Sequence, residues 1–353
     1  QGVIEKRSTL PILSNILLDA TGSKLKIIAT DLDLIFVTEL KNVEILQEGK
    51  TTTTSSIMYD IIRKFNSGNK INFNQTGENK IQLESEKSIF NLNCISASEF
   101  PITEENFGSH EFMIKSQELL KLLNKCKFSI SNDETRHYLS GIYIHQTRLE
   151  DKSYLTAAAT DSHRMSISKI LLKEEIKFEP IILPKKAIFQ LVNLLEDYDG
   201  DVKISNEKSK IKFEMENSIL VSKLIDGKFP NYIQVIPKNN KKRLEIDLKL
   251  FMSSVDRVAS VSLDKKDSVK FILTKDKLNL SVNNASSGDG NETINVSFDH
   301  ELNISFNSRY LIDIASQLDG DKIELYLNET GSPALIKDPS DFDSIYVVMP
   351  MKG

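Results

Sequence analysis

The chain has 353 residues, of which 40% are apolar and 27% are charged, and its formal net charge is −5. This composition is typical of a globular protein and excludes a fibrous or largely disordered one. No apolar stretch approaches the roughly 20 residues of a membrane-spanning helix, and the opening segment lacks the apolar core of a secretion signal, so we expect a cytoplasmic protein without a membrane partner.

Five segments show the pattern of an amphipathic helix. In each, apolar residues recur at i, i+3, i+4 and i+7, which places four side chains on one helix face. Ser116, Asp247 and Asn307 lie where N-caps are expected for three of them. In chain order, the segments are 58–65, 119–126, 188–195, 248–255 and 311–318.

Short runs that alternate apolar and polar residues lie between these helices. Such runs predict half-buried strands of antiparallel sheet, and together with the helices they predict an α+β fold. They include 71–73, 81–83, 142–144, 202–204, 211–213, 219–221, 269–273, 278–282, 304–306 and 323–325.

The predicted elements recur at an interval of about 120 to 130 residues. Ala29-Thr30-Asp31 returns 130 positions later as Ala159-Thr160-Asp161, and Phe100-Pro101 returns 129 positions later as Phe229-Pro230. Met349-Pro350 closes the chain in the same way. We therefore predict three similar domains, over residues 1–108, 109–238 and 239–353, of which the first lacks the opening strand and helix of the others.

Five motifs follow one another along the chain: Ser8-Thr9-Leu10-Pro11-Ile12-Leu13-Ser14-Asn15-Ile16-Leu17, Arg136-His137-Tyr138-Leu139-Ser140-Gly141, Ala159-Thr160-Asp161-Ser162-His163-Arg164-Met165, Asp226-Gly227-Lys228-Phe229-Pro230-Asn231-Tyr232 and Tyr346-Val347-Val348-Met349-Pro350-Met351. In this order they resemble the bacterial sliding clamp family, the DNA polymerase III beta subunits. The resemblance runs from Arg7 to Lys352 and implies the DNA clamp fold: three domains, each an antiparallel sheet with two helices, that close into a ring as a head-to-tail homodimer. It offers segment 256–263 as a candidate interface.

The resemblance further implies that the ring encloses double-stranded DNA and that basic side chains meet its phosphates without reading the base sequence. Each of these side chains could instead be an ordinary surface charge. The net charge argues only weakly against DNA, because it averages over the whole surface. The matching positions are Arg7, Arg136, His137, Tyr138, Lys185 and Lys186; the helix face opposite Leu119 and Leu122 adds Lys121 and Lys125.

A second implied site is a hydrophobic pocket for short partner peptides. Methionine, aliphatic and tyrosine side chains suit an adaptable apolar groove. The implied partners are the clamp loader complex, the DNA polymerase III alpha subunit and other proteins with a clamp-binding motif. The alternative is that these are ordinary core residues. The set is Leu139, Thr160, Ser162, His163, Arg164, Met165, Pro230, Val235, Tyr310, Val347, Met349, Pro350 and Met351.

Signals of catalysis, of a metal site and of a cofactor are absent from the sequence. It has no phosphate-binding glycine loop and no metalloprotease motif, and we expect its two cysteines to be buried, reduced thiols. Asp161 and His163 could form an acid–base pair, but the first repeat has Asp31 and Asp33 instead. We therefore predict a non-catalytic processivity clamp; the alternatives are a protein scaffold that does not encircle DNA and a hydrolase.

Overall fold

The computed structural model describes residues 2–4, 10–102, 107, 111–262 and 268–351. The chain forms two compact units. The first comprises Gln1–Gln117, Lys177–Glu179 and Lys186–Leu224; the second comprises Glu118–Ile176, Pro180–Lys185 and Ile225–Gly353.

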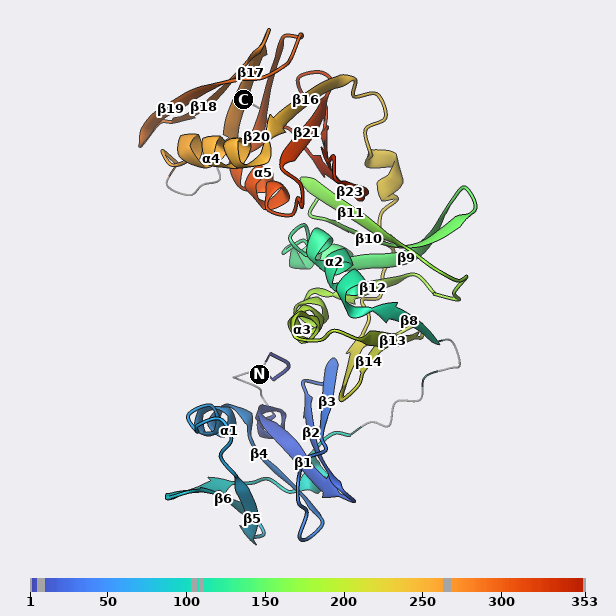
Figure 1. Cartoon of the computed structure of the whole chain (residues 1–353), viewed down its shortest axis with the longest axis vertical. Helices are drawn as coiled ribbons and strands as arrows, with labels where there is room; N and C mark the ends of the chain where they lie inside the picture. The colour runs from blue at the N-terminus through green and yellow to red at the C-terminus, as the bar shows by residue number, and fades with distance from the viewer. Residues whose placement is uncertain (1, 5–9, 103–106, 108–110, 263–267, 352–353) are drawn as a thin grey trace. The chain divides into compact units, whose positions relative to one another are not determined.

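The order of elements repeats along the chain (Figure 1). The second and third repeats each run strand, helix, four strands, helix, three strands, and the first repeat has the last eight of these ten elements. This confirms the predicted threefold repeat. The first repeat contains β1 Asn15–Thr21, β2 Lys24–Thr30, β3 Leu34–Leu40, β4 Gly49–Thr54, α1 Ser55–Ile62, β5 Asn72–Gly77, β6 Lys80–Ser85 and β7 Ser88–Asn93. The second contains β8 Glu111–Lys115, α2 Ser116–Lys127, β9 Gly141–Leu149, β10 Lys152–Thr160, β11 Arg164–Leu171, β12 Ile181–Pro184, α3 Lys185–Glu196, β13 Asp201–Asn206, β14 Lys210–Met215 and β15 Ser218–Lys223. The third contains β16 Lys242–Asp247, α4 Leu248–Ala259, β17 Ser268–Thr274, β18 Lys277–Asn284, β19 Gly288–Asn295, β20 Leu302–Asn307, α5 Ser308–Ala315, β21 Lys322–Leu327, β22 Ala334–Asp338 and β23 Asp341–Val348.

The helix termini follow local chemistry. Asp247 caps α4 by accepting a hydrogen bond from the backbone N–H of Leu250 at 2.8 Å, and Asn307 caps α5 in the same manner. Ser116 is instead the first residue of α2, and its hydroxyl accepts from the N–H of Gly200. Helices α1 and α5 end three residues before the predicted ends, because their last turns tighten to i→i+3 bonds such as Phe65 N–H to Ile62 C=O.

Each unit contains an eight-stranded antiparallel sheet built from two repeats. In the first unit the strand order is β4-β1-β2-β3-β15-β14-β13-β8, and in the second it is β12-β9-β10-β11-β23-β22-β21-β16. Smaller sheets, β5-β6-β7 and β19-β18-β17-β20, belong to the first and third repeats. The compact units therefore differ from the three sequence repeats because the large sheets cross the boundaries between repeats.

The two places where repeats join have the same register. In the first unit Leu34 of β3 pairs with Ser222 of β15, and in the second Arg164 of β11 pairs with Val348 of β23. Leu34 and Arg164 lie 130 positions apart in the chain, and Ser222 and Val348 lie 126 positions apart. The two pairs are therefore related by the repeat. We call β3 with β15 the first junction and β11 with β23 the second junction.

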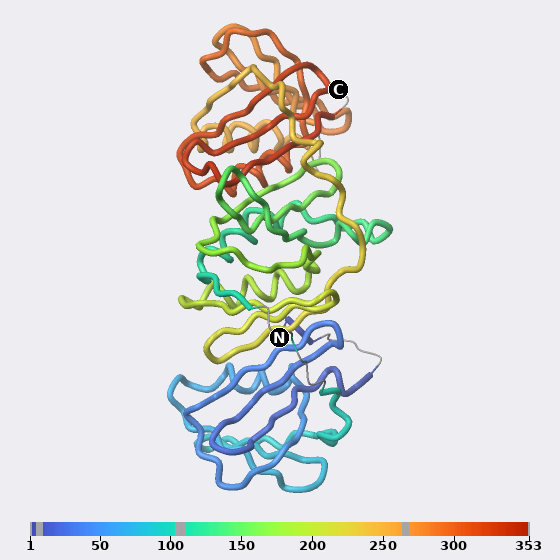
Figure 2. Tube along the Cα trace, turned by 90° about the vertical axis from the view of Figure 1, so that its right-hand side faces the viewer, coloured from blue at the N-terminus to red at the C-terminus, as the bar shows by residue number. Residues whose placement is uncertain are grey.

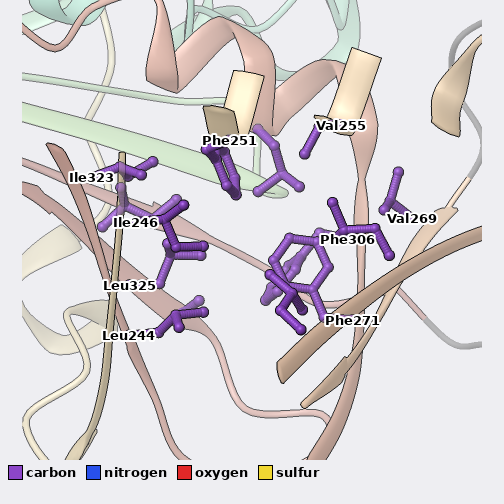
Figure 3. Close-up of a cluster of buried hydrophobic side chains, with 14 of the residues drawn as sticks. Leu244, Ile246, Phe251, Val255, Val269, Phe271, Phe306, Ile323 and Leu325 are labelled. Atoms are coloured by element: carbon purple, nitrogen blue, oxygen red, sulfur yellow. The ribbon is translucent and has the colours of Figure 1, made fainter. Parts of the chain in front are cut away.

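The core of the third repeat lies between its helices and two sheets. Figure 3 shows Phe251 and Val255 of α4 above side chains from both sheets: Ile246 and Leu325 from one, and Phe271 from the other. Helices α4 and α5 pack against each other, and α4 also packs on β18 and β19. In the first repeat, Met58 of α1 packs in a core with Leu83 and Cys94. Cys94 and Cys126 are both free and buried, as predicted.

Residues 225–241, which we call the connector, lead from the second repeat to the third. Figure 2 shows this segment, in gold, along one side of the second repeat. It contains a short 3₁₀ helix, Tyr232–Val235, and buries Phe229 and Tyr232. These two rings pack in one apolar cluster with Met165 of β11 and Val347 of β23. The connector therefore lies over the second junction.

Candidate functional site

The turn between β10 and β11 shapes the candidate site. The hydroxyl of Thr160 donates to the C=O of Arg164 at 2.7 Å and accepts from the N–H of Ser162. The carboxylate of Asp161 accepts from the N–H groups of His163 and Arg164, each at 2.9 Å. Ser162 has φ of 76°, in the left-handed region that few residues other than glycine adopt.

The first repeat has the same turn between β2 and β3. Thr30 donates to the C=O of Leu34 at 2.8 Å, Asp31 accepts from the N–H groups of Asp33 and Leu34, and Leu32 has φ of 78°. The recurring Thr-Asp pair is therefore a device that closes a hairpin.

This geometry removes the support for a hydrolase. The carboxylate of Asp161 already accepts two backbone N–H groups and the Nε of Arg164 at 3.1 Å. Since it is occupied by the turn, it is not positioned to orient His163 as a base. Among the described residues, no group of three or more His, Cys, Asp or Glu could hold a metal ion.

Arg164 fixes the centre of the candidate site. Its Nη1 donates to Asp313 of α5 at 2.6 Å, and its Nη2 donates to the C=O of Phe128, also at 2.6 Å. The guanidinium group lies 4.4 Å from the ring centroid of Tyr310, within the range of a cation–π interaction. The Tyr310 ring also stacks against His163, with 6.5 Å between centroids. His163, Arg164 and Tyr310 therefore lie together, and their role in a peptide pocket stays a prediction.

The second junction supplies the apolar part. Met165 pairs with Val347 across β11 and β23, and both belong to the buried cluster that contains Leu139. The chain beyond β23 continues the contact, because the N–H of Met349 donates to the C=O of His163 at 2.8 Å. The N–H of Met351 donates to Ser305, and both methionine side chains stay more than a third exposed. Apolar, flexible side chains therefore border a buried apolar base.

The remaining predicted pocket residues flank this base. In the connector, Pro230 and Val235 are exposed. Phe229, which precedes Pro230, and Tyr232, which lies between Pro230 and Val235, are buried in the apolar cluster of the second junction. Ser162 lies in the turn, where its hydroxyl accepts from Nη1 of Arg136 at 2.6 Å. Pro350 follows Met349 in the chain and is partly exposed.

The predicted DNA-binding residues Arg136, His137 and Tyr138 lie together in the 3₁₀ helix Glu134–Leu139. Nε of Arg136 bonds to Asp133 at 2.8 Å, and bonds from Thr135 and Arg136 hold the pKa of Asp133 at about 2. Nε2 of His137 lies 3.1 Å from the C=O of Asp226. Arg136 thus contacts the pocket residue Ser162 as well, so the two predicted sets adjoin.

Lys185 and Lys186 open α3. Lys185 bonds to Asn132 at 2.5 Å, and Lys186 pairs with Asp31. Their role toward DNA stays a prediction, and Arg7 lies outside the described residues.

One prediction is wrong. Lys125 does not face solvent, because it is 4% exposed and its Nζ pairs with Asp319 at 2.9 Å and lies 3.7 Å from the buried Asp341. Lys121 joins the same group at 3.2 Å from Asp341 but stays 46% exposed. These bonds link α2 to the third repeat, a role that the helical pattern alone could not reveal.

No helix among the described residues is both long and apolar enough to cross a membrane. Family models cover most of the chain: the N-terminal domain of the DNA polymerase III beta subunit matches residues 1–104, its central domain matches 113–231, and its C-terminal domain matches 233–352.

Curated relatives agree with these matches. The beta sliding clamp of Caulobacter vibrioides is 36% identical over 355 residues, which cover 100% of this chain and 95% of the relative. The beta sliding clamp of Escherichia coli K12 is 29% identical and covers 99% of this chain and 95% of the relative.

Solved structures have the same fold. The sliding clamp of Bartonella birtlesii, crystallised with griselimycin bound, aligns with a TM-score of 0.94 at 36% identity, over 99% of this chain and 94% of that one. The clamp of Pseudomonas aeruginosa, also with griselimycin bound, aligns with a TM-score of 0.93 at 29% identity, over 100% of this chain and 95% of that one.

Proposed function

The chain belongs to the DNA polymerase III beta subunit family, and from this premise we propose how its residues carry out the family's work. It is a sliding clamp, a non-catalytic processivity factor that acts in DNA replication. The family implies a dimeric ring, DNA and a polymerase as partners. We propose that the ring acts in the cytoplasm and that the domain boundaries fall near residues 108 and 238.

Ring closure follows from the junctions. In the first junction β3 pairs with β15, and in the second β11 pairs with β23. The repeat makes β19 equivalent to β3 and β11, and β7 equivalent to β15 and β23, and both are edge strands in the described sheets. An edge strand presents unpaired N–H and C=O groups to another chain. We infer that β19 of each copy pairs with β7 of the other, as two-fold symmetry requires.

This pairing refines the candidate interface at 256–263. The C-terminal part of α4 packs on β19, where a Cβ on Gly290 would lie 3.0 Å from the C=O of Val258; Leu263 lies outside the described residues. Sedimentation over a range of concentrations tests the dimer: a mass of two chains at micromolar concentration supports it, and a monomer throughout contradicts it.

The ring holds DNA by topology. The observation that carries this proposal is the threefold repeat with two junctions of equal register, because repeated edge pairing of like domains closes a circle when the last edge meets the first. Arg136, His137, Tyr138, Lys185 and Lys186, with Arg7, would contact phosphates. After loading, the clamp should stay on nicked circular DNA and slide off the same DNA once it is made linear. Equal retention on both would favour a scaffold that does not encircle DNA.

The residues around the second junction would bind partner peptides. We infer that the clamp loader complex, the alpha subunit and other proteins with a clamp-binding motif share this pocket. Support comes from the exposed Met349 and Met351, which border a buried apolar base, and from Arg164, whose guanidinium group lies over the Tyr310 ring that stacks on His163. Griselimycin binds two relatives and is a ready competitor.

The pocket is tested with a fluorescein-labelled peptide that carries the clamp-binding motif of the alpha subunit, and polarisation reports its affinity. Met349→Ala and Tyr310→Ala should each weaken binding, and griselimycin should displace the peptide. Unchanged affinity in both variants, with an intact fold, would reject the pocket.

A further inference from the structure

Four aromatic rings tie the connector to the second repeat. Tyr143 and His145 project from β9, and Phe229 and Tyr232 come from the connector. Tyr143 stacks on Phe229 with 4.9 Å between centroids and an interplanar angle of 6°, and it stacks on His145 at 4.6 Å. Tyr232 meets the edges or faces of the other three rings at 5.7 to 6.4 Å. Packing of this kind adds to the burial of the rings themselves.

One polar bond completes the cluster. Nε2 of His145 lies 2.8 Å from the hydroxyl of Tyr232, whose side chain is almost fully buried. A buried hydroxyl without a partner is costly, so this bond fixes where the ring can lie. Burial raises the pKa of Tyr232 to about 12 and lowers the pKa of His145 below its usual value. Both groups are therefore neutral near pH 7.

The anchored residues alternate with predicted pocket residues. Pro230 lies between Phe229 and Tyr232, and the N–H of Tyr232 donates to its C=O at 2.8 Å. Val235 ends the 3₁₀ helix that Tyr232 begins. The anchors point into the cluster while Pro230 and Val235 stay exposed. A displacement of Tyr232 would therefore also displace Pro230 and Val235, because only a few hydrogen-bonded backbone residues separate them from Tyr232.

In the part of the first repeat that the structure describes, this arrangement is not found. The residues of β1 that occupy the places of Tyr143 and His145 are Leu17 and Asp19, since both pairs face equivalent positions of the next strand. Asp19 pairs with Lys50 instead of an aromatic ring. The ring cluster on β9 thus has no counterpart on β1 of the first repeat.

We propose that His145 is a positioning residue for the peptide pocket: through Tyr232 it holds the connector so that Pro230 and Val235 keep their places beside the bound peptide. This inference rests on the proposed pocket. His145 does not touch the peptide. It acts by supplying the partner for the Tyr232 hydroxyl at the base of the connector.

The position of His145 also makes the pocket sensitive to pH. The groups that face it are Tyr143 on its own strand, Thr156 across β10, and Tyr232 on the connector, none of which offers a negative charge at neutral pH. Protonation would place an uncompensated charge among the rings. The pKa of His145 is lowered from its ordinary value of 6.5, so the neutral imidazole is the favoured form in the folded protein. The contact between His145 and Tyr232 is therefore intact above pH 6.5 and weakens as the pH falls from 6.5 toward the lowered pKa.

The test compares three variants in the labelled-peptide assay. Tyr232→Phe keeps the ring and removes the hydroxyl, and His145→Leu removes the bonding partner. Both should weaken binding about three- to tenfold, the range that one lost hydrogen bond gives. His145→Gln can still bond to the hydroxyl and should recover most of the affinity at pH 7.5.

The pH profile separates positioning from a general loss of stability. Between pH 7.5 and 5.5 the wild type should lose affinity more steeply than His145→Gln, since every other histidine is present in both proteins. Wild-type affinity in both Tyr232→Phe and His145→Leu, or equal pH profiles for wild type and His145→Gln, would overturn the proposal.

Met349→Ala separates a failure of the proposed peptide pocket from a failure of the positioning role of His145. If Met349→Ala loses binding while Tyr232→Phe and His145→Leu do not, only the positioning role fails. If the wild type does not bind the peptide at all, the pocket fails and the positioning role fails with it.

Discussion

The first and second junctions share a backbone and differ in chemistry. Each has a Thr-Asp turn, the same register, and one closing bond: Lys223 N–H to Asp33 C=O in the first, and Met349 N–H to His163 C=O in the second, both at 2.8 Å. In the first junction the side chains of Asp33 and Lys223 form an exposed ion pair at 2.9 Å. In the second, the equivalent side chains are an imidazole and a thioether.

The comparison shows that a few side chains decide what a shared backbone does. Buried Leu34 occupies the place of Arg164, so the first junction has no guanidinium group to hold a tyrosine ring. The second junction also contains the buried Asp341 of β23, which forms ion pairs with Lys125 and Lys121 of α2. The first junction is closed by solvated charges, whereas the second exposes an apolar border.

The largest expected effect concerns those buried ion pairs. Lys125→Met leaves the buried Asp341 with Lys121 as its remaining ion-pair partner, and removal of one partner of a buried pair costs roughly 3–5 kcal/mol. The loss of unfolding free energy is measured by urea unfolding, with hydrogen exchange of amides in the second unit as the readout. The double variant Lys125→Met with Asp341→Met removes both charges and should regain most of the loss; if it is no more stable than the single variant, the pair is not the cause.

An exchange of one side chain between junctions tests the pocket. Met349→Lys installs the residue of the first junction, and a buried or partly buried charge should reduce peptide affinity at least tenfold, about 1.4 kcal/mol. The backbone bond to His163 does not depend on the side chain, so the fold should be unchanged. Lys223→Met is the matched control and should bind peptide like the wild type. Similar losses in both variants would show that the junctions are not distinct in function.

The surface ion pair of the first junction should contribute little. Lys223→Ala removes a partner of Asp33, but the side chains are 53% and 75% exposed, so we expect at most about 0.5 kcal/mol of destabilisation. Thermal unfolding at low and high salt provides the measurement. A loss of several kcal/mol would mean that charge, and not strand pairing, holds this junction.

The smallest effect concerns the two turns. Leu32→Gly relieves a leucine at φ of 78° and should stabilise the first unit by about 0.5 kcal/mol, since the relief of strain is partly offset by the flexibility of glycine. Ser162→Gly should behave similarly because its turn has the same bonds. Opposite signs for the two variants in thermal unfolding would show that the turns differ in strain.

Much of the fold could be predicted from local patterns. The spacing of apolar residues gave five helices, and the return of Thr30-Asp31 at Thr160-Asp161 marked two identical turns, because both features depend on neighbours in sequence. The α+β fold with three similar domains is confirmed by the order of elements. The last turns of α1 and α5 were predicted as helix because a 3₁₀ turn continues the apolar spacing for one more residue.

The contacts between distant segments could not be predicted. Arg164 was assigned to the pocket by resemblance, but its partners Phe128 and Asp313 lie 36 and 149 positions away, and no periodic pattern connects them. Lys125 was assigned to DNA because the helical pattern gave it a polar face; the carboxylates that bury it come from another repeat. The role of a polar side chain is thus hardest to assign where contacts with distant segments decide whether the side chain is exposed to solvent or buried.

The matched register of the two junctions bears on how such a chain could arise. A seam of main-chain hydrogen bonds demands little from the side chains beside it, so tandem copies of a duplicated gene can diverge in sequence while their products still dock at the same places. Two seams with the same backbone can therefore carry different side chains, such as Asp33 with Lys223 and His163 with Met349, and both still hold their strands together.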